Sequence, residues 1–182
     1  IFFKFKVINN ITGIGTSLIN SKFQKMLVIN LLKIAFMRSN LVFFQNNEDK
    51  NFFIQNKIIT SNKSIVLKYF GVDVLKYKFS PLIFKDFKNL NFLYFGRIIK
   101  DKGIFELIEA IKLVKKKFPK SRFTILGKID YNNPGFIDQR LVDQWANSNL
   151  IIYHNFTNNP LKFINDADCV ILPSYREGLP KS

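Results

Sequence analysis

The chain has 182 residues, of which 47% are hydrophobic, including 21 Phe, and 23% are charged. This length accommodates one domain or two partial ones, and the apolar content is enough for a packed core, so intrinsic disorder is excluded. A single Cys and a single His exclude an internal disulfide framework and the usual Cys- or His-based metal sites. The formal net charge of +15 is typical of proteins that bind nucleic acid, an anionic membrane or an anionic substrate.

The positive charge is concentrated in the first half of the chain. Residues 1–94 carry 14 basic and 4 acidic side chains, a net of +10, whereas residues 95–182 carry 14 and 9, a net of +5. Only five basic residues are Arg, and Lys, Asn, Ile and Phe are frequent throughout, which indicates a coding bias toward A and T as the main source of the charge. The scarcity of Arg and the lack of a nucleic-acid-binding motif leave nucleic-acid binding as a weaker alternative.

The first part of the chain alternates short apolar runs with helical patterns. Compact β-branched and aromatic runs predict strands at residues 2–8, 41–45 and 64–69. Apolar residues at helical spacing predict a helix over 22–38, and acidic residues in a first turn favour a shorter helix over 47–55.

A connecting segment follows these elements. Residues 71–90 have no clear period and contain Gly and Pro, which indicates a linker rather than a helix or strand. We place the domain boundary at 81–90, between a first domain of residues 1–80 and a second domain of residues 91–182.

Strands and helices alternate regularly in the second domain. Strands are predicted at residues 91–95, 123–126, 150–153 and 169–172, and helices over 102–118, 136–146 and 160–166. Short connections between alternating strands and helices predict right-handed βαβ units on a parallel sheet, which is the doubly wound α/β architecture. In such sheets, ligands bind beyond the carboxyl ends of the strands.

The loop after the first strand of the second domain is the first candidate site. Residues 96–103 read Gly-Arg-Ile-Ile-Lys-Asp-Lys-Gly and lead into a helix, whose first N–H groups favour an anion. Gly96 and Gly103 permit a tight turn. Arg97 offers a planar fork for phosphate oxygens and Lys102 adds a point charge, so the loop suits a diphosphate. The alternative is that both cations are solvated charges in a lysine-rich chain.

The loop after the last predicted strand is the second candidate site. Residues 173–180 read Pro-Ser-Tyr-Arg-Glu-Gly-Leu-Pro. The carboxylate of Glu177 can accept hydrogen bonds from sugar hydroxyls, and Gly178 lets the backbone approach a ligand. The alternative is a surface turn in which Arg176 and Glu177 form a pair of little energetic consequence.

These two loops and the pattern between them closely resemble the donor-binding domain of the retaining GT-B glycosyltransferases of family 4, the group 1 glycosyl transferases. The matching segments are Phe95-Gly96-Arg97, Asp101-Lys102-Gly103, Leu107-Ile108-Glu109-Ala110, Ile125-Leu126-Gly127, Asp166-Ala167-Asp168-Cys169-Val170 and Leu172-Pro173-Ser174-Tyr175-Arg176-Glu177-Gly178-Leu179-Pro180. Residues 11–15, 42–46 and 71–73 look like the acceptor half of the same family, as found in bacterial enzymes that add hexosamines to lipid-linked surface glycans. The resemblance implies a GT-B fold with two Rossmann-like doubly wound domains, both incomplete in this chain.

The resemblance also implies roles for individual residues. Arg97 and Lys102, in the loop that starts at Gly96, would clamp the diphosphate of a nucleotide sugar and stabilise the leaving nucleotide. Glu177 would contact the donor sugar, with the backbone N–H groups of Gly178 and Leu179 beside it. The family uses no metal ion and retains anomeric configuration through a front-face displacement, in which electrostatic stabilisation of the departing diphosphate is the main contribution of the protein.

The expected function is therefore transfer of a sugar from a nucleotide sugar, UDP-hexose or UDP-N-acetylhexosamine, to a lipid-linked or polysaccharide acceptor. The basic first half suits peripheral contact with an anionic bilayer, which places the protein in the cytoplasm at the inner face of the plasma membrane. Because the chain begins at Ile1 and ends at Ser182 in a predicted loop, we expect an interior fragment that is inactive by itself. A GT-B protein that binds a nucleotide sugar without transferring it, such as an epimerase or a degenerate scaffold, remains the main alternative.

Overall fold

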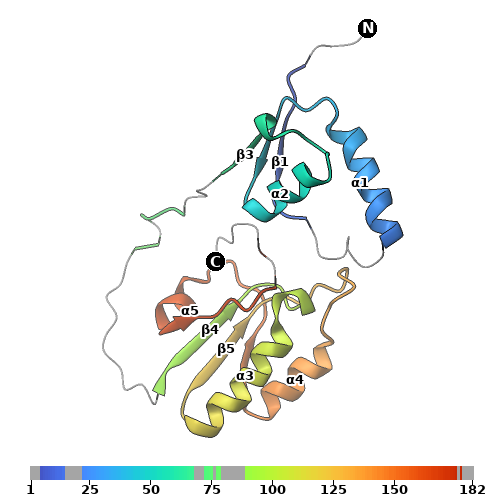
Figure 1. The fold of residues 1–182 in the computed structure, drawn as a ribbon. Helices are drawn as coiled ribbons and strands as arrows, with labels where there is room; N and C mark the ends of the chain where they lie inside the picture. Colours follow the sequence, from blue (N-terminus) through green and yellow to red (C-terminus); the bar gives the residue numbers. More distant parts are fainter. Residues whose placement is uncertain are drawn as a thin grey trace. The chain divides into compact units, whose positions relative to one another are not determined.

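A computed structural model describes residues 5–14, 22–67, 72–75, 77–78, 89–175 and 177. The chain divides into two compact units, one built on Ile1–Val72 with Glu177–Lys181 and the other on Asp73–Arg176 with Ser182. Each unit contains one parallel sheet (Figure 1). Most of the boundary expected at 81–90 lies outside the described residues, and that boundary stays a prediction.

The first unit is a three-stranded parallel sheet in the order β1-β2-β3. Its elements are β1 (Ile8–Ile11), α1 (Lys22–Phe36), β2 (Leu41–Phe44), α2 (Asn47–Gln55) and β3 (Ser64–Val66). Both crossovers run the same way across the sheet, so right-handed connections place both helices on one face. On that face the rings of Phe36 and Phe44 contact the ring of Phe53 edge-on, with distances between ring centroids of 5.2 and 5.1 Å respectively. These three rings form the core of this unit.

The first strand lies later than the sequence predicts. Of the expected strand at 2–8, residues 2–4 lie outside the described residues and residues 5–7 have no regular structure. The parallel ladder to β2 instead pairs Asn9 with Val42 and Asn10 with Phe43. A ladder uses backbone N–H and C=O groups, so these asparagines pair as well as apolar residues would.

A buried carboxylate connects the end of β1 to the start of α2. Asn46 caps α2 by accepting a hydrogen bond from the Asp49 N–H at 2.7 Å, which satisfies one free donor of the first turn. The side chain of Asp49 is completely buried, and its Oδ2 accepts from the Ile14 N–H at 3.2 Å and the Asn46 amide at 3.1 Å. Asp49 therefore ties the residues after β1 to the helix that follows β2.

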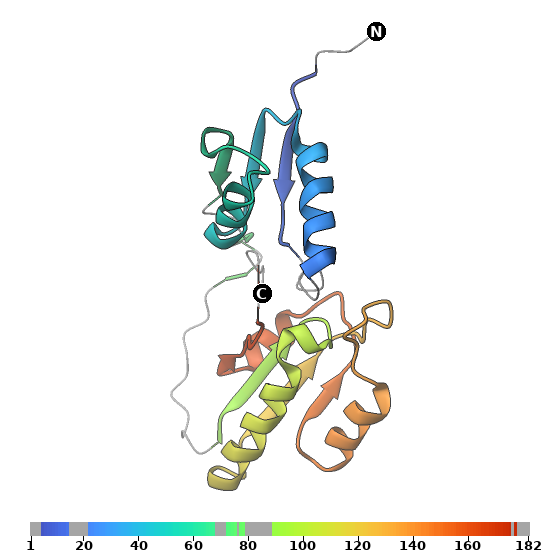
Figure 2. The ribbon, with the colours of Figure 1, turned by 45° about the vertical axis from the view of Figure 1, so that its right-hand side comes forward.

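The second unit is a four-stranded parallel sheet in the order β6-β5-β4-β7. Its elements are β4 (Asn91–Phe95), α3 (Ile104–Lys117), β5 (Arg122–Leu126), α4 (Gln139–Asn147), β6 (Ile152–His154), α5 (Leu161–Asp166) and β7 (Cys169–Val170). The helices α3 and α4 cover one face (Figures 1 and 2). The crossover through α5 runs in the reverse direction, and its right-handed path places α5 on the opposite face. This arrangement confirms the doubly wound α/β prediction.

The helix α3 follows the predicted pattern closely. Its apolar stripe of Ile104, Leu107, Ile108 and Ile111 is at most 5% exposed and packs on the sheet. Three lysines occupy its last turn, where cations interact favourably with the helix dipole.

The helix α4 begins later than the sequence predicts. The sequence predicts a start at Phe136, but the backbone of Phe136 forms an antiparallel bridge with Ile99, and Ile137 is buried in the core. The helix starts after Asp138, whose side chain accepts a hydrogen bond from the Arg140 N–H at 2.8 Å. Tertiary pairing of this loop therefore overrides its local helical pattern.

We predict that Asp49→Ala destabilises the first unit by about 3 kcal/mol, because it leaves the buried Ile14 N–H and the half-buried Asn46 amide without their acceptor. Hydrogen exchange measured on peptides covering residues 46–55 reports the change. The matched control is Glu48→Ala, which removes an exposed acid from the same helical turn and should cost less than ~1 kcal/mol. Equal protection in the two variants would contradict the role assigned to Asp49.

Candidate functional site

The candidate site lies where the strand order of the second sheet reverses. From β4 the chain moves in one direction to β5 and β6, and it then returns to place β7 on the other side of β4. The loops that leave β4 and β7 therefore emerge side by side at the carboxyl edge of the sheet. Open α/β sheets bind ligands at such a reversal, and these are the two loops that the sequence singles out.

The two loops are in direct contact. The N–H of Tyr175 donates to the carbonyl of Asp101 at 3.1 Å, and the Tyr175 hydroxyl donates to the carboxylate of Glu106. Gly103 has a φ of +67°, and a Cβ atom there would lie 2.2 Å from the carbonyl oxygen of Pro173. Only glycine fits this left-handed position at the start of α3.

A second close approach joins the ends of β4 and β5. The Gly96 N–H donates to the carbonyl of Leu126 at 3.0 Å, which continues the ladder past the sheet. A Cβ atom at Gly127 would lie 1.8 Å from the Gly96 carbonyl oxygen. The hydroxyl of Tyr153 donates to the carbonyl of Gly127 at 3.2 Å and supports this contact from the neighbouring strand. The start of the candidate loop at Gly96 therefore packs directly against the backbone of Gly127, with no side chain between them.

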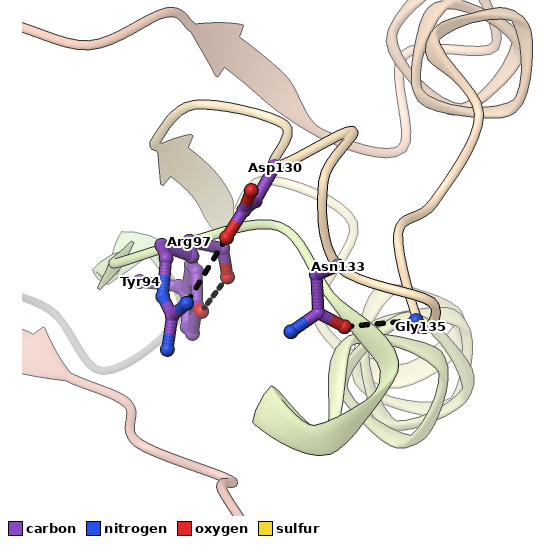
Figure 3. Close-up of polar contacts among 5 residues, drawn as sticks. All are labelled: Tyr94, Arg97, Asp130, Asn133 and Gly135. Carbon is purple, nitrogen blue, oxygen red and sulfur yellow. Dashed lines mark hydrogen bonds and ion pairs between the residues drawn. The ribbon is translucent and has the colours of Figure 1, made fainter. Parts of the chain in front are cut away.

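Arg97 is held at both its backbone and its side chain (Figure 3). The hydroxyl of Tyr94, a residue only 2% exposed, donates to the Arg97 carbonyl at 2.8 Å. The guanidinium pairs with Asp130, with Nη1 and Oδ2 3.0 Å apart, while 58% of the Arg97 side chain stays exposed. An oriented and solvent-accessible guanidinium is suited to bind phosphate oxygens.

Asp130 is the site residue that sequence reasoning missed. It lies four residues after β5, in the loop that follows the carboxyl end of that strand. Its only sequence signal is this position, because a single acid in a loop has no periodic pattern. Its contact with Arg97, 33 residues away, depends on the pairing of β4 with β5.

The remaining predicted site residues are Lys102, Glu177, Gly178 and Leu179, and the structure describes the first two. Lys102 is half-buried and ends the single 3₁₀ turn, Lys100–Lys102, that leads into α3. Glu177 is half-buried and belongs to the first unit. Gly178 and Leu179 lie outside the described residues. The donor-sugar role of Glu177 stays a prediction.

This arrangement has the features of an anion site. Arg97 and Lys102 lie in one loop, and this loop leads directly into the N-terminus of α3, the end of a helix that favours an anion. Among the described residues, no group of three His, Cys, Asp or Glu side chains is placed to hold a metal ion. A parallel α/β sheet with a cationic, glycine-bounded loop at its reversal point defines a nucleotide-binding class of fold.

The chain belongs to the glycosyl transferases group 1 family, whose model matches residues 78–182. A relative from Campylobacter jejuni, N,N'-diacetylbacillosaminyl-diphospho-undecaprenol alpha-1,3-N-acetylgalactosaminyltransferase, is 28% identical over 94% of this chain and 47% of its own length. The capsular polysaccharide biosynthesis glycosyltransferase CapM of Staphylococcus aureus is 29% identical over 69% of this chain and 36% of its own. This chain therefore spans less than half the length of these relatives.

Solved structures confirm the fold class. The Anabaena protein HepE, crystallised with UDP and glucose, matches 95% of this chain and 47% of its own with a TM-score of 0.71 and 19% sequence identity. The likeness is to the GT-B glycosyltransferase fold, as the sequence resemblance implied. The relatives place the family's activity in the synthesis of glycans and polysaccharides.

The hydrogen bond between Tyr175 and Glu106 predicts opposite pKa shifts. It lowers the pKa of Glu106 below its ordinary value of 4.5, because the hydroxyl stabilises the carboxylate, and it raises the pKa of Tyr175 above 10.0. Its contribution is present above the ordinary pKa of Glu106 and is lost as pH falls through the lowered value. It is likewise complete below pH 10.0 and lost as pH rises through the raised pKa of Tyr175.

A ¹³C NMR titration of labelled tyrosines tests this prediction. The Tyr175 resonance, identified by its absence in Tyr175→Phe, should titrate above pH 10.0 and should shift back toward that value in Glu106→Gln. Titration at an ordinary pH in both proteins would mean that the loop after β7 is not held to α3 by this bond.

Proposed function

We propose that the intact protein transfers a sugar from a nucleotide sugar, UDP-hexose or UDP-N-acetylhexosamine, to a lipid-linked or polysaccharide acceptor in surface-glycan synthesis. Family membership supports the class of reaction. The donor is suggested by the UDP and glucose bound to HepE, and the acceptor by the activities for which the Campylobacter and Staphylococcus relatives are named.

The observation that carries the proposal is the oriented Arg97 in the loop between β4 and α3. A nucleotide sugar presents a diphosphate whose negative charge grows as the bond to the sugar breaks. Arg97 and Lys102 then stabilise the leaving nucleotide more strongly than the bound donor, which is the condition for lowering the barrier. Gly96, Gly103 and Gly127 hold the backbone of this loop in place without intruding side chains.

The reaction would proceed with retention of configuration. The bond between the anomeric carbon and the diphosphate oxygen breaks while the acceptor oxygen forms its bond to the anomeric carbon from the same face. The proton of the acceptor hydroxyl passes to the departing diphosphate, whose remaining negative charge is stabilised by Arg97 and Lys102. Glu177 would contact the donor sugar, and the N–H groups of Gly178 and Leu179 would bind beside it. We assign no metal ion to this step, so an excess of chelator should leave the rate of transfer unchanged.

Arg97→Ala should lower kcat for transfer from the UDP-sugar by about a hundredfold or more, because it removes a cation that acts on the developing charge. Release of UDP in the presence of a lipid-linked acceptor measures the rate. The matched control is Arg140→Ala, which removes another Arg whose side chain is 91% exposed on α4 and should leave the rate unchanged.

Two results would overturn the proposal. Equal activity in the Arg97 and Arg140 variants would show that the loop after β4 does not stabilise the leaving group. Binding of UDP without acceptor-dependent release of UDP would favour the non-transferring alternative, a GT-B protein that only binds its nucleotide sugar.

We also propose that α1 rests on the anionic inner face of the cytoplasmic membrane, where a lipid-linked acceptor is found. Its outward side exposes Phe23, Leu27, Leu31 and Ile34, each at least 53% exposed, at the spacing of one helical face. The exposed Lys22 and Lys33 lie near the two ends of the helix, on one side of this face. Apolar side chains bordered by lysines suit the headgroup region of an anionic bilayer. No helix in the described part of the chain is long and apolar enough to span a membrane.

Leu27→Asp should weaken binding to vesicles that contain anionic lipids about tenfold at low salt, since it places a negative charge in the apolar face. Co-sedimentation with the vesicles measures the change. The control is Leu113→Asp, which alters an equally prominent apolar residue, 66% exposed, on α3 of the other unit. Wild-type protein that stays in the supernatant, or equal losses in both variants, would contradict this role of α1.

A further inference from the structure

The geometry points to Asp130 as a positioning residue that orients Arg97 toward the donor diphosphate. This inference rests on the proposed function, since it assigns a task to a residue that itself touches no substrate. Asp130 takes one N–H of the guanidinium, at 3.0 Å, and a guanidinium has five N–H donors in a fixed plane. The pair therefore restrains the position of the guanidinium and leaves its other N–H donors for phosphate oxygens.

The loop that carries Asp130 is anchored by backbone pairing to the loop that carries Arg97. The Ile98 N–H donates to the carbonyl of Lys128 at 3.0 Å, and Ile98 and Ile129 form a parallel bridge beyond the end of the sheet. Both isoleucines are at most 3% exposed. Arg97 and Asp130 are thus each adjacent to a buried residue of the same bridge.

Hydrogen bonds also hold the far end of the same loop. The Lys100 N–H donates to the carbonyl of Gly135 at 2.7 Å, and the Asn133 side chain accepts from the Gly135 N–H at 2.8 Å (Figure 3). The Asn133 N–H donates to the carbonyl of Asp130 at 2.9 Å. Both ends of the Asp130 loop are therefore bonded to the loop after β4, which favours a constant separation between Asp130 and Arg97.

A positioning role for Asp130 and a purely electrostatic effect of its charge predict opposite changes in the affinity for UDP when Asp130 is removed. Asp130 is an acid beside an anion site, so charge alone predicts that its removal strengthens the binding of a diphosphate. Positioning predicts the reverse, because an Arg97 without its partner must lose side-chain freedom when the donor binds. The sign of the change in UDP affinity therefore separates the two.

The experiment is calorimetric titration of UDP into the intact protein, its Asp130→Asn and Asp130→Ala variants, and the matched control Glu109→Gln. Glu109 is an exposed acid that pairs with Lys112 at 2.7 Å on α3. We expect the Kd for UDP to rise about fivefold in Asp130→Ala, the cost of ordering one long side chain, and less in Asp130→Asn, whose amide oxygen still accepts a hydrogen bond. Glu109→Gln should leave the Kd unchanged.

A double variant shows whether Asp130 acts through Arg97. In an Arg97→Ala background, Asp130→Ala should no longer weaken the binding of UDP, because no guanidinium remains to orient. Unchanged or tighter binding in the single Asp130→Ala variant would overturn the inference while leaving the proposed function intact. Failure of the wild-type protein to bind UDP would overturn the proposed function itself, and the inference with it.

Discussion

The site depends on one feature of the topology, the pairing of β7 with β4 on the side opposite β5. This pairing reverses the direction of the strand order, and it brings the loops after β4 and β7 to the same point of the carboxyl edge. Tyr175 then reaches both Asp101 and Glu106 across a sequence distance of about seventy residues. If β7 extended the sheet beyond β6 instead, the two loops would lie at opposite ends of it.

Close contacts between backbone segments make this edge rigid. Glycine allows the loops to meet at two points, Gly96 against Gly127 and Gly103 against Pro173, where a Cβ atom would clash with a carbonyl oxygen. The backbone beneath Arg97 is therefore set by main-chain contacts and by the buried Tyr94 hydroxyl. A long side chain on such a frame needs only one further partner to be oriented, and Asp130 supplies it.

Local sequence patterns located most of the elements but not all of their ends. The helix expected over 47–55 is found as Asn47–Gln55, because capping and first-turn signals act within a few residues of the chain. The predicted start of α4 at Phe136 is wrong, because the backbone of Phe136 forms a bridge and the side chain of Ile137 packs in the core. The first strand was misplaced because backbone pairing with β2 decides its extent, and side-chain hydrophobicity does not report on that pairing.

The sequence by itself determined the alternation of strands and helices, the two glycine-containing loops, and the cations Arg97 and Lys102. Each of these features depends only on residues that are close together in the sequence. Only the tertiary structure decided which loops meet and which acid faces which cation. The contact of Arg97 with Asp130 and that of Tyr175 with Glu106 join distant parts of the chain. Such contacts follow from the order and register of parallel strands, which are set by the packing of the whole sheet and not by any local pattern.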